Sequence, residues 1–416
     1  MLRKIDLDQL TPGMYVARLD RSWLDVPIFR HRITSPEQVR QLRQYQVREV
    51  FIDTDKGEDI AAPPGDDAAA QPPAQPSIFG QRAVPPVDPT PFEQEIAQAD
   101  RTFHQALDTI SSAMEAIGGG GRMDLEPVNE VVDGLIASIL RNRDAMTSLA
   151  TLRGVSEDIY QHCVRVSILS LVFANHMGVS RADLKAVGLG AILHDVGKVD
   201  IPEQIRAAAQ PLTQDEFKQF KKHPLLGARK LSAQKGINKR ALMVLLQHHE
   251  RADGSGYPLG LQDDEILELA KVVMVADTYD KLTMREHQGA KLTPYEALAW
   301  IREWGGRQFS KAVVDGFEEA LGLYPVGSFV RLSDNSLGIV LSVHHNTALM
   351  PKVWLVFDGN HRMLPDGRIV DLANQRSRNP ISIIAAVKAE DLGIDLAGYV
   401  REKRIFESAL PTDVTG

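Results

Sequence analysis

The sequence has a single cysteine, Cys163, so no disulfide can form within the chain. It also lacks any run of the roughly 18 to 20 apolar residues that a membrane-spanning helix needs. The first six residues, Met1 to Asp6, are not followed by the apolar segment of a secretion signal. We therefore expect a protein of the reducing cytoplasm that has no membrane span.

An excess of positive charge is absent as well. The 47 lysines and arginines are outnumbered by 55 acidic residues, which gives a net charge of -8, and no basic run is typical of a nucleic-acid-binding tail. Long nucleic acid is therefore not an expected partner, whereas a small anionic ligand can still bind at a local cluster of positive charge or metal. With 416 residues, of which 44% are hydrophobic, the chain is long enough for two to four domains.

The first third of the sequence divides into three segments. Residues 1–56 alternate short apolar runs with turn residues, which predicts a small α+β module. Its Trp23 and Phe29 are interpreted as core residues rather than as a ligand surface. Residues 57–91, rich in alanine and proline, lack the apolar surface that folding needs and predict an extended, partly disordered linker. Residues 92–144 contain connecting helices, which we expect to pack on the next domain rather than to form a dimer stalk.

Residues 145–325 repeat apolar side chains at helical spacing, and no stretch among them alternates like a half-buried strand. After Pro325 the period changes to two, in short segments separated by turn residues, which predicts strands within residues 326–416. The expected fold class is mainly α. It comprises an all-α helical domain, a small N-terminal α+β module and a small C-terminal β-rich appendage.

Polar residues stand at the ends of predicted buried helices. His194 and Asp195 follow a long apolar run, although neither is a good core residue, and Asp277 interrupts a second one. Asp158 precedes His162 by one helical turn, so both can face one point. Such groups are costly to bury without partners, and a metal ion uses imidazole nitrogen and carboxylate oxygen together. The candidate ligands are His162, His194, Asp195, His223, His248, His249 and Asp277, with Asp158 as a further carboxylate.

This set is too large for one metal ion. A lone histidine is more often a plain core or surface residue, so the metal hypothesis depends on convergence of the whole set. Five histidines and two or three carboxylates exceed the coordination of one zinc ion and suit two metals bridged by Asp195. Nitrogen and oxygen ligands fit iron, manganese, nickel or zinc alike.

Two motifs resemble those of a known family. The segment His194-Asp195-Val196-Gly197-Lys198, with His162 before it and Asp277 after it, resembles the pattern of the HD phosphohydrolase superfamily. The segment from His248 to Pro258, which reads His-His-Glu-Arg-Ala-Asp-Gly-Ser-Gly-Tyr-Pro, is similar to the signature of the HD-GYP branch. Residues 1–56 resemble the small N-terminal domain found ahead of some HD-GYP domains.

The resemblance implies a phosphodiesterase that hydrolyses cyclic di-GMP to pGpG, with GMP as a further product. Two divalent metals, iron or manganese before nickel or zinc, would activate the attacking water, with Asp195 between them and Lys198 on the scissile phosphate. Arg285 resembles a substrate-contacting arginine, although Arg-Glu-His here departs from the family's Arg-Pro-Tyr. Gly256 and Tyr257 would contact the substrate, and Asp158 or Glu157 would supply the carboxylate that some family members use for a third ion. Their loop, a tight turn by composition, is also implied to engage diguanylate cyclases.

Two alternatives stay open at this point. The domain could be a catalytically weak module that binds a cyclic dinucleotide and signals through its Gly-Tyr-Pro surface. It could also hydrolyse a related phosphoester, because no motif specifies which bases the pocket accepts. A homodimer is a further expectation.

Overall fold

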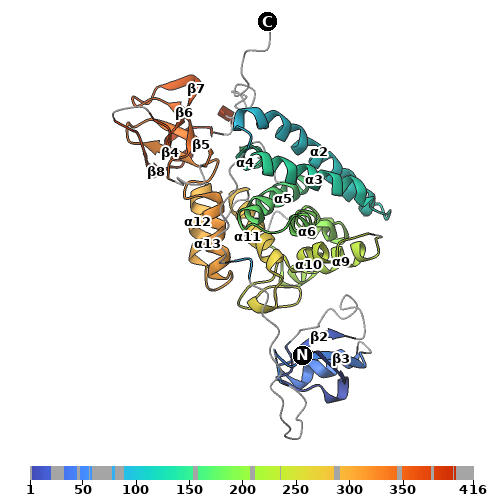
Figure 1. Ribbon diagram of the computed structural model, residues 1–416. Coiled ribbons are helices and arrows are strands. Elements are labelled where there is room, and N and C mark those ends of the chain that lie inside the picture. The colour runs from blue at the N-terminus through green and yellow to red at the C-terminus, as the bar shows by residue number, and fades with distance from the viewer. Residues whose placement is uncertain are drawn as a thin grey trace.

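The computed structural model describes most of the chain, and Figure 1 shows its elements from the N-terminus to the C-terminus. The predictions for Trp23, Phe29, Glu157 and Arg285 lie outside the described residues. Those residues are 2–19, 32–44, 47–55, 57–58, 77–79, 89–152, 158–206, 211–234, 236–284, 291–343, 349–375, 379–396 and 398–399.

The N-terminal module is an antiparallel three-stranded sheet with one α-helix. Its elements are β1 (Leu2–Asp6), η1 (Leu7–Gln9), β2 (Val16–Leu19), α1 (Pro36–Gln44) and β3 (Glu49–Asp53). The strand order is β1-β3-β2, and Ile5 lies opposite Val50. Because successive side chains of a strand point to opposite faces, Val50 and Ile52 enter the same core, where Leu42 of α1 also lies.

Helices form the centre of the protein. They are α2 (Phe92–Gly118), α3 (Leu125–Arg141), α4 (Arg143–Leu152), α5 (Ile159–His176), α6 (Arg181–Ile192), η3 (Val196–Asp200), α7 (Glu203–Arg206), α8 (Gln214–Phe220), α9 (His223–Ser232), α10 (Lys239–Gln247), η4 (Asp263–Glu265), α11 (Glu268–Met284), α12 (Pro294–Glu303) and α13 (Lys311–Leu321). Helix α5 contacts α4, α6, α11 and α13, and every residue from Val164 to Ala174 is buried. Helices α2 and α3 belong to the same hydrophobic core, as expected for packing helices rather than a stalk.

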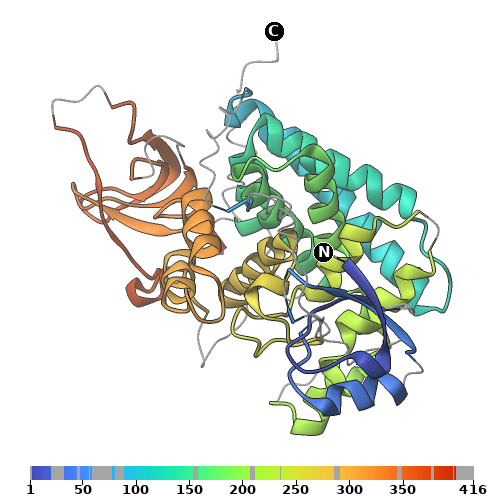
Figure 2. The same ribbon diagram turned by 60° about the horizontal axis from the view of Figure 1, so that its bottom comes forward.

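A five-stranded antiparallel sheet follows the helices, beside α12 and α13 in both views (Figures 1 and 2). Its strands are β4 (Phe329–Leu332), β5 (Leu337–Ser342), β6 (Lys352–Phe357), β7 (Met363–Asp371) and β8 (Ile383–Ala386), in the order β7-β6-β5-β4-β8; the last described element is η5 (Glu390–Leu392). The Ser148 hydroxyl of α4 donates to the Leu341 carbonyl at 2.7 Å, and Val343 N donates to Asp144 at 3.0 Å. The predicted fold class is thereby confirmed, whereas the exact bounds of the five predicted segments stay predictions.

One short piece of the predicted linker packs on the helical domain. Ser77 Oγ and Ile78 N donate to the carboxylate of Glu268 at the start of α11, the latter at 2.9 Å. The Phe79 ring is 8% exposed and lies 6.0 Å from the Phe173 ring of α5. Residues 77–79 are therefore anchored on the helical domain, whereas the extended, partly disordered linker over residues 57–91 stays a prediction. None of the helices in the described part of the chain combines the length and the apolar character needed to cross a bilayer.

Candidate metal centre

Seven of the predicted ligands lie together inside the helical domain. Their ligand atoms form two groups, and within each group all atoms lie within 4.8 Å of one another. The first half-site consists of His162, His194 and Asp277, and the second half-site of Asp195, His223, His248 and His249. All seven side chains are buried, which brings five imidazoles and two carboxylates into one water-poor space.

Most of these residues stand where a helix begins or ends. His194 and Asp195 directly follow α6, His223 opens α9, and His248 and His249 directly follow α10. The last carbonyls of a helix have no partner within it, so they are available to a nearby side-chain donor.

Three imidazoles use such carbonyls. In each, Nδ1 lies at hydrogen-bond distance from the carbonyl oxygen three residues earlier. Because a carbonyl only accepts, Nδ1 carries the proton and Nε2 keeps its lone pair, as a metal ligand requires. The three pairs are His194 with Ala191 at 2.7 Å, His223 with Phe220 at 2.9 Å and His248 with Leu245 at 2.6 Å.

The first half-site is compact. His162 Nε2 lies 3.2 Å from His194 Nε2 and 3.1 Å from Asp277 Oδ1, and His194 Nε2 lies 3.7 Å from the same oxygen. Two nitrogens that bind one ion at about 2.1 Å are themselves about 3.0 to 3.4 Å apart. The spacing of these side chains therefore suits one shared ion.

Asp195 lies between the two half-sites. Its Oδ2 is 3.3 Å from His194 Nε2 and 3.5 Å from His162 Nε2. Its Oδ1 is 3.3 Å from His223 Nε2 and 4.0 Å from His248 Nε2. Each oxygen thus faces a different half-site, which is the arrangement that a carboxylate bridging two ions needs.

The donor set fits divalent metal. Asp195 Oδ1, Asp277 Oδ1 and His249 Nε2 are buried and make no hydrogen bond within the described part of the chain, although other ligand atoms face them. Buried polar atoms are rarely left in this way, because each such atom loses its interaction with water. Imidazole and carboxylate ligands without thiolate suit a divalent transition metal.

Protonation also favours metal binding. Burial lowers the pKa of His223, and it lowers the pKa values of His248 and His249 well below the usual range. Neutral imidazole is the form that binds metal. His162 differs, because its contacts with Asp277 and Asp280 outweigh burial and raise its pKa.

Each ligand aspartate is paired with a lysine. Lys198 Nζ donates to Asp195 Oδ2 at 2.5 Å, and Lys281 Nζ donates to Asp277 Oδ2 at 2.6 Å. Burial alone would raise the pKa of Asp195, but His194 and Lys198 outweigh it and hold the value well below the usual range. Lys281 does the same for the pKa of Asp277. Both carboxylates are therefore ionised at neutral pH.

A buried pair that sequence reasoning missed supports His162. Asp280, one turn after Asp277 on α11, accepts from His162 Nδ1 at 2.7 Å and from Arg165 Nε at 2.6 Å. Asp280 thereby fixes the ring so that Nε2 faces the first half-site. The signal available in the sequence was a second carboxylate three residues after Asp277, which follows the apolar run from Val272 to Ala276.

Glu250 organises the loop that follows α10. Its carboxylate accepts from Leu259 N at 2.7 Å and from Leu261 N at 2.9 Å. Because Glu250 precedes the Gly-Tyr-Pro segment and both leucines follow it, these hydrogen bonds connect the start of the loop to its end. The side chain is fully buried, and burial raises its pKa to about 7. This role was not predicted from the sequence.

Gly256 and Tyr257 fold back on the start of this loop, where Tyr257 N donates to the His249 carbonyl at 3.1 Å. A Cβ at Gly256 would lie 2.3 Å from Arg251 N and 2.4 Å from Glu250 Cα, so the loop closes only with glycine there. The Tyr257 ring lies 4.6 Å from the His249 ring, at an angle of 31°. The predicted substrate contact is thus adjacent to the second half-site.

Some predicted residues are not brought to the cluster. Asp158 is exposed and caps α5 by accepting from Tyr160 N, and it belongs to neither half-site. The helix therefore begins just after the carboxylate that was expected to face His162. Cys163 lies near His194 and Asp195, but burial raises its pKa well above the usual range, so the thiol stays protonated.

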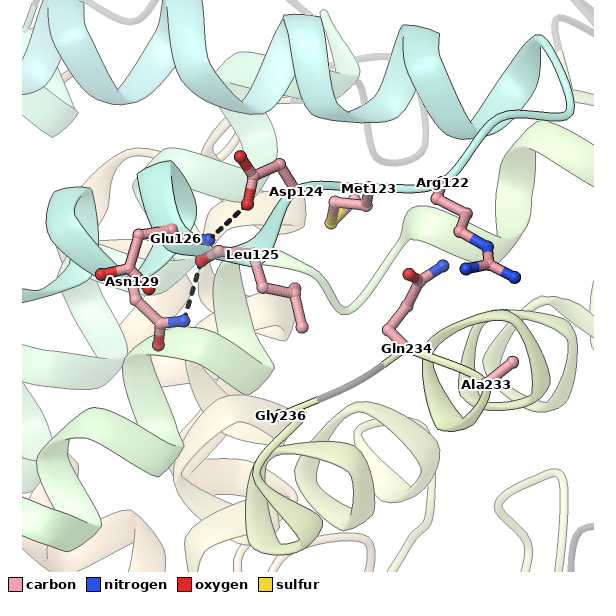
Figure 3. Close-up of a pocket in the computed structure, with 9 residues that line it drawn as sticks. All are labelled: Arg122, Met123, Asp124, Leu125, Glu126, Asn129, Ala233, Gln234 and Gly236. Carbon is pink, nitrogen blue, oxygen red and sulfur yellow. Dashed lines mark hydrogen bonds between the residues drawn. The ribbon is translucent and has the colours of Figure 1, made fainter.

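A cavity of about 600 Å³ lies apart from the cluster, between the α2–α3 connection and the residues after α9 (Figure 3). Asp124 accepts from Glu126 N at 3.1 Å, and the Asn129 amide donates to the Leu125 carbonyl at 2.8 Å. These two polar side chains of the cavity thus serve the start of α3, and we assign the chemistry to the buried cluster.

Comparisons with known proteins agree with the two sequence motifs. Residues 2–128 match a domain of unknown function, DUF3391, and residues 136–313 match the HD domain. The cyclic di-GMP phosphodiesterase PA4108 of Pseudomonas aeruginosa is 33% identical over 379 residues, which cover 89% of each chain. A cyclic di-GMP phosphodiesterase of Thermotoga maritima is 36% identical over 161 residues, or 38% of this chain and 44% of that protein.

Among solved structures, Bd1817, an HDG"Y"P protein from Bdellovibrio bacteriovorus, is 20% identical with a TM-score of 0.45, and the match covers 77% of this chain and 99% of that one. The Pseudomonas relative exceeds 30% identity over most of this chain, and the two domain matches lie in order along it. The chain therefore belongs to the HD-GYP family, with a DUF3391 domain ahead of its HD domain.

Proposed function

We propose that this protein is a metal-dependent phosphodiesterase that hydrolyses cyclic di-GMP to linear pGpG. The observation that carries the proposal is the pair of half-sites joined by Asp195, beside the Gly-Tyr-Pro loop. A relative that is 33% identical and spans 89% of the chain carries the name of this activity.

The seven ligands have distinct tasks in this reaction. His162, His194 and Asp277 would hold one ion, His223, His248 and His249 would hold the second, and Asp195 could serve both. When bound, the two ions supply a water of lowered pKa as nucleophile and stabilise charge at the phosphate. The surrounding apolar helices exclude bulk water, which strengthens every charge interaction at the site.

The substrate is held by groups around the cluster. Lys198 is buried and donates to Asp195 Oδ2, so its ammonium group is held at the cluster, where it can also donate to a non-bridging phosphate oxygen. Tyr257 presents an aromatic ring beside His249, where a base or sugar can pack. Arg285, which follows α11 in the sequence, is also proposed to contact the substrate. Gly256 lets the loop approach the site.

We infer two ions rather than three. The third ion was expected on Asp158, which is exposed at the start of α5. Iron or manganese is the proposed metal, with nickel or zinc as the alternatives that the same ligands accept. Binding of diguanylate cyclases at the Gly-Tyr-Pro loop and a homodimer stay predictions.

The test combines metal analysis with a hydrolysis assay on the same full-length sample. Protein loaded anaerobically with Fe²⁺ or Mn²⁺ is expected to contain two ions per chain and to convert cyclic di-GMP to pGpG, with any GMP resolved by chromatography. The His194→Ala and Asp195→Ala variants are expected to lose turnover. His104→Ala is the matched control, because His104 is exposed on α2, away from the cluster.

The outcomes separate the candidate functions. Loss of activity in both cluster variants with the control unchanged supports the phosphodiesterase. Tight binding of cyclic di-GMP by loaded protein without product would instead favour a nucleotide-binding module. Faster hydrolysis of pGpG or of a mixed cyclic dinucleotide in a substrate panel would reassign the substrate.

A further inference from the structure

Lys281 contacts the first half-site, and neither sequence motif includes it. It lies four residues after Asp277 on α11, a spacing that places two side chains on one face of a helix. Its ammonium group is 2.6 Å from Asp277 Oδ2, and 27% of its side chain is exposed. The lysine thus reaches from the surface to a buried ligand.

The contact divides the two oxygens of Asp277. Oδ2 accepts from Lys281, whereas Oδ1 faces His162 Nε2 at 3.1 Å and His194 Nε2 at 3.7 Å. His249 Nδ1 lies 3.9 Å from Oδ2, which is beyond hydrogen-bond distance. Lys281 is therefore the donor that fixes the outer oxygen among the described residues.

Fixing that oxygen matters because a carboxylate rotates readily about its last side-chain torsion. Without a donor at Oδ2, either oxygen could turn toward the imidazoles, or both could lie between them. A ligand held in one orientation loses less entropy when it binds an ion. Lys198 also donates to a ligand carboxylate, but to Asp195 Oδ2, the oxygen that faces His194 and His162.

We propose that Lys281 is a positioning residue of the first half-site, which holds Asp277 so that Oδ1 alone is presented to the ion. The proposal deepens the proposed metal-dependent function and rests on it. It predicts that loss of the ammonium group weakens one ion of the pair and leaves the second ion, on His223, His248 and His249, bound as before.

The experiment is a Mn²⁺ titration of chelator-treated full-length protein, followed by equilibrium metal analysis and by electron paramagnetic resonance. Wild-type protein is expected to bind two Mn²⁺ ions with a spectrum of a coupled pair. Lys281→Met keeps the apolar stem and loses the donor, and it is expected to weaken one of the two ions about 10- to 100-fold. At Mn²⁺ concentrations that fill only the tighter site of this variant, its spectrum is expected to be that of a single ion.

Two further variants separate positioning from a general structural role. Lys281→Arg keeps a charged donor and is expected to restore the coupled pair. Lys185→Met is the matched control, because Lys185 also forms an ion pair with an aspartate. Its Nζ lies 2.8 Å from Asp133 Oδ2 on the surface. Lys281→Ala replaces the methionine variant if that variant does not fold.

The result that overturns the proposal is an unchanged affinity for both ions in Lys281→Met or Lys281→Ala, whatever the effect on urea denaturation of the metal-free protein. Equal weakening of both ions, or failure of the arginine variant to restore the pair, also contradicts it. If wild-type protein binds no Mn²⁺, Fe²⁺ or Zn²⁺, the proposed function itself fails and the role of Lys281 fails with it. Metal binding without cyclic di-GMP hydrolysis refutes only the proposed activity.

Discussion

Replacing Asp280 with asparagine is the strongest test of the residues that hold the metal ligands in place. Asp280 accepts from His162 Nδ1 at 2.7 Å, from Arg165 Nε at 2.6 Å and from Arg165 Nη2 at 3.1 Å, and all three residues are buried. An amide offers one oxygen where the carboxylate offers two, so at least one of these donors faces an NH₂ group in the variant. The guanidinium of Arg165 also loses its counter-charge.

Two effects of different size follow. Removal of one partner from a buried ion pair costs about 3 to 5 kcal/mol of stability, because the remaining charge stays out of water. The loss of the carboxylate that orients His162 lowers metal affinity by about 10- to 100-fold. Urea denaturation of the metal-free protein, followed by circular dichroism, measures the first effect, and Mn²⁺ titration measures the second.

A double variant, Arg165→Met with Asp280→Leu, separates these effects. It removes both charges, so much of the lost stability is expected to return, as it does when buried ion pairs are replaced by apolar residues of similar volume. His162 Nδ1 still lacks its acceptor, so metal affinity is expected to stay low. Recovery of metal affinity in the double variant would refute the orienting role of Asp280.

Three other predictions concern the loop, the linker and the ions. Glu250→Gln leaves one of the Leu259 and Leu261 amides without its acceptor and is expected to cost about 1 to 3 kcal/mol, seen as faster hydrogen exchange at both amides. Phe79→Ala is expected to destabilise the helical domain by about 3 kcal/mol in urea denaturation; an unchanged midpoint would contradict the packing of this ring on Phe173. Chelation is expected to abolish hydrolysis while helical circular dichroism persists, because apolar contacts hold the bundle; Mn²⁺ should restore activity.

Much of the fold and of the cluster could be predicted because the pattern is local. Helix α6 was expected to end near His194 and Asp195, and it ends at Ile192, because its apolar run stops there. The same holds for α10 before His248. Side chains at helix ends can converge on one point, and the cost of burying them alone made a shared site the simplest expectation.

The supporting residues could not be predicted in this way, because their partners are distant in sequence. Asp280 meets Arg165 across 115 residues, and nothing in either helix identifies the other. Gly197 is similar, since a Cβ there would lie 2.0 Å from the His223 carbonyl, so the close approach of η3 to α9 depends on it. The expectation for Asp158 failed to account for capping, because a carboxylate before a helix serves the first free amides of that helix.

The charges around the cluster explain how so polar an interior can fold and then receive an anion. Each buried aspartate is in direct contact with a basic side chain: Asp195 with Lys198, Asp277 with Lys281 and Asp280 with Arg165. Three of the imidazoles are neutral, those of His223, His248 and His249. The paired side chains therefore nearly cancel in charge before any ion binds. Two divalent ions then leave the site positive overall, in a space where few water molecules screen the charge. A phosphodiester would bring the negative charge that such a positive site attracts.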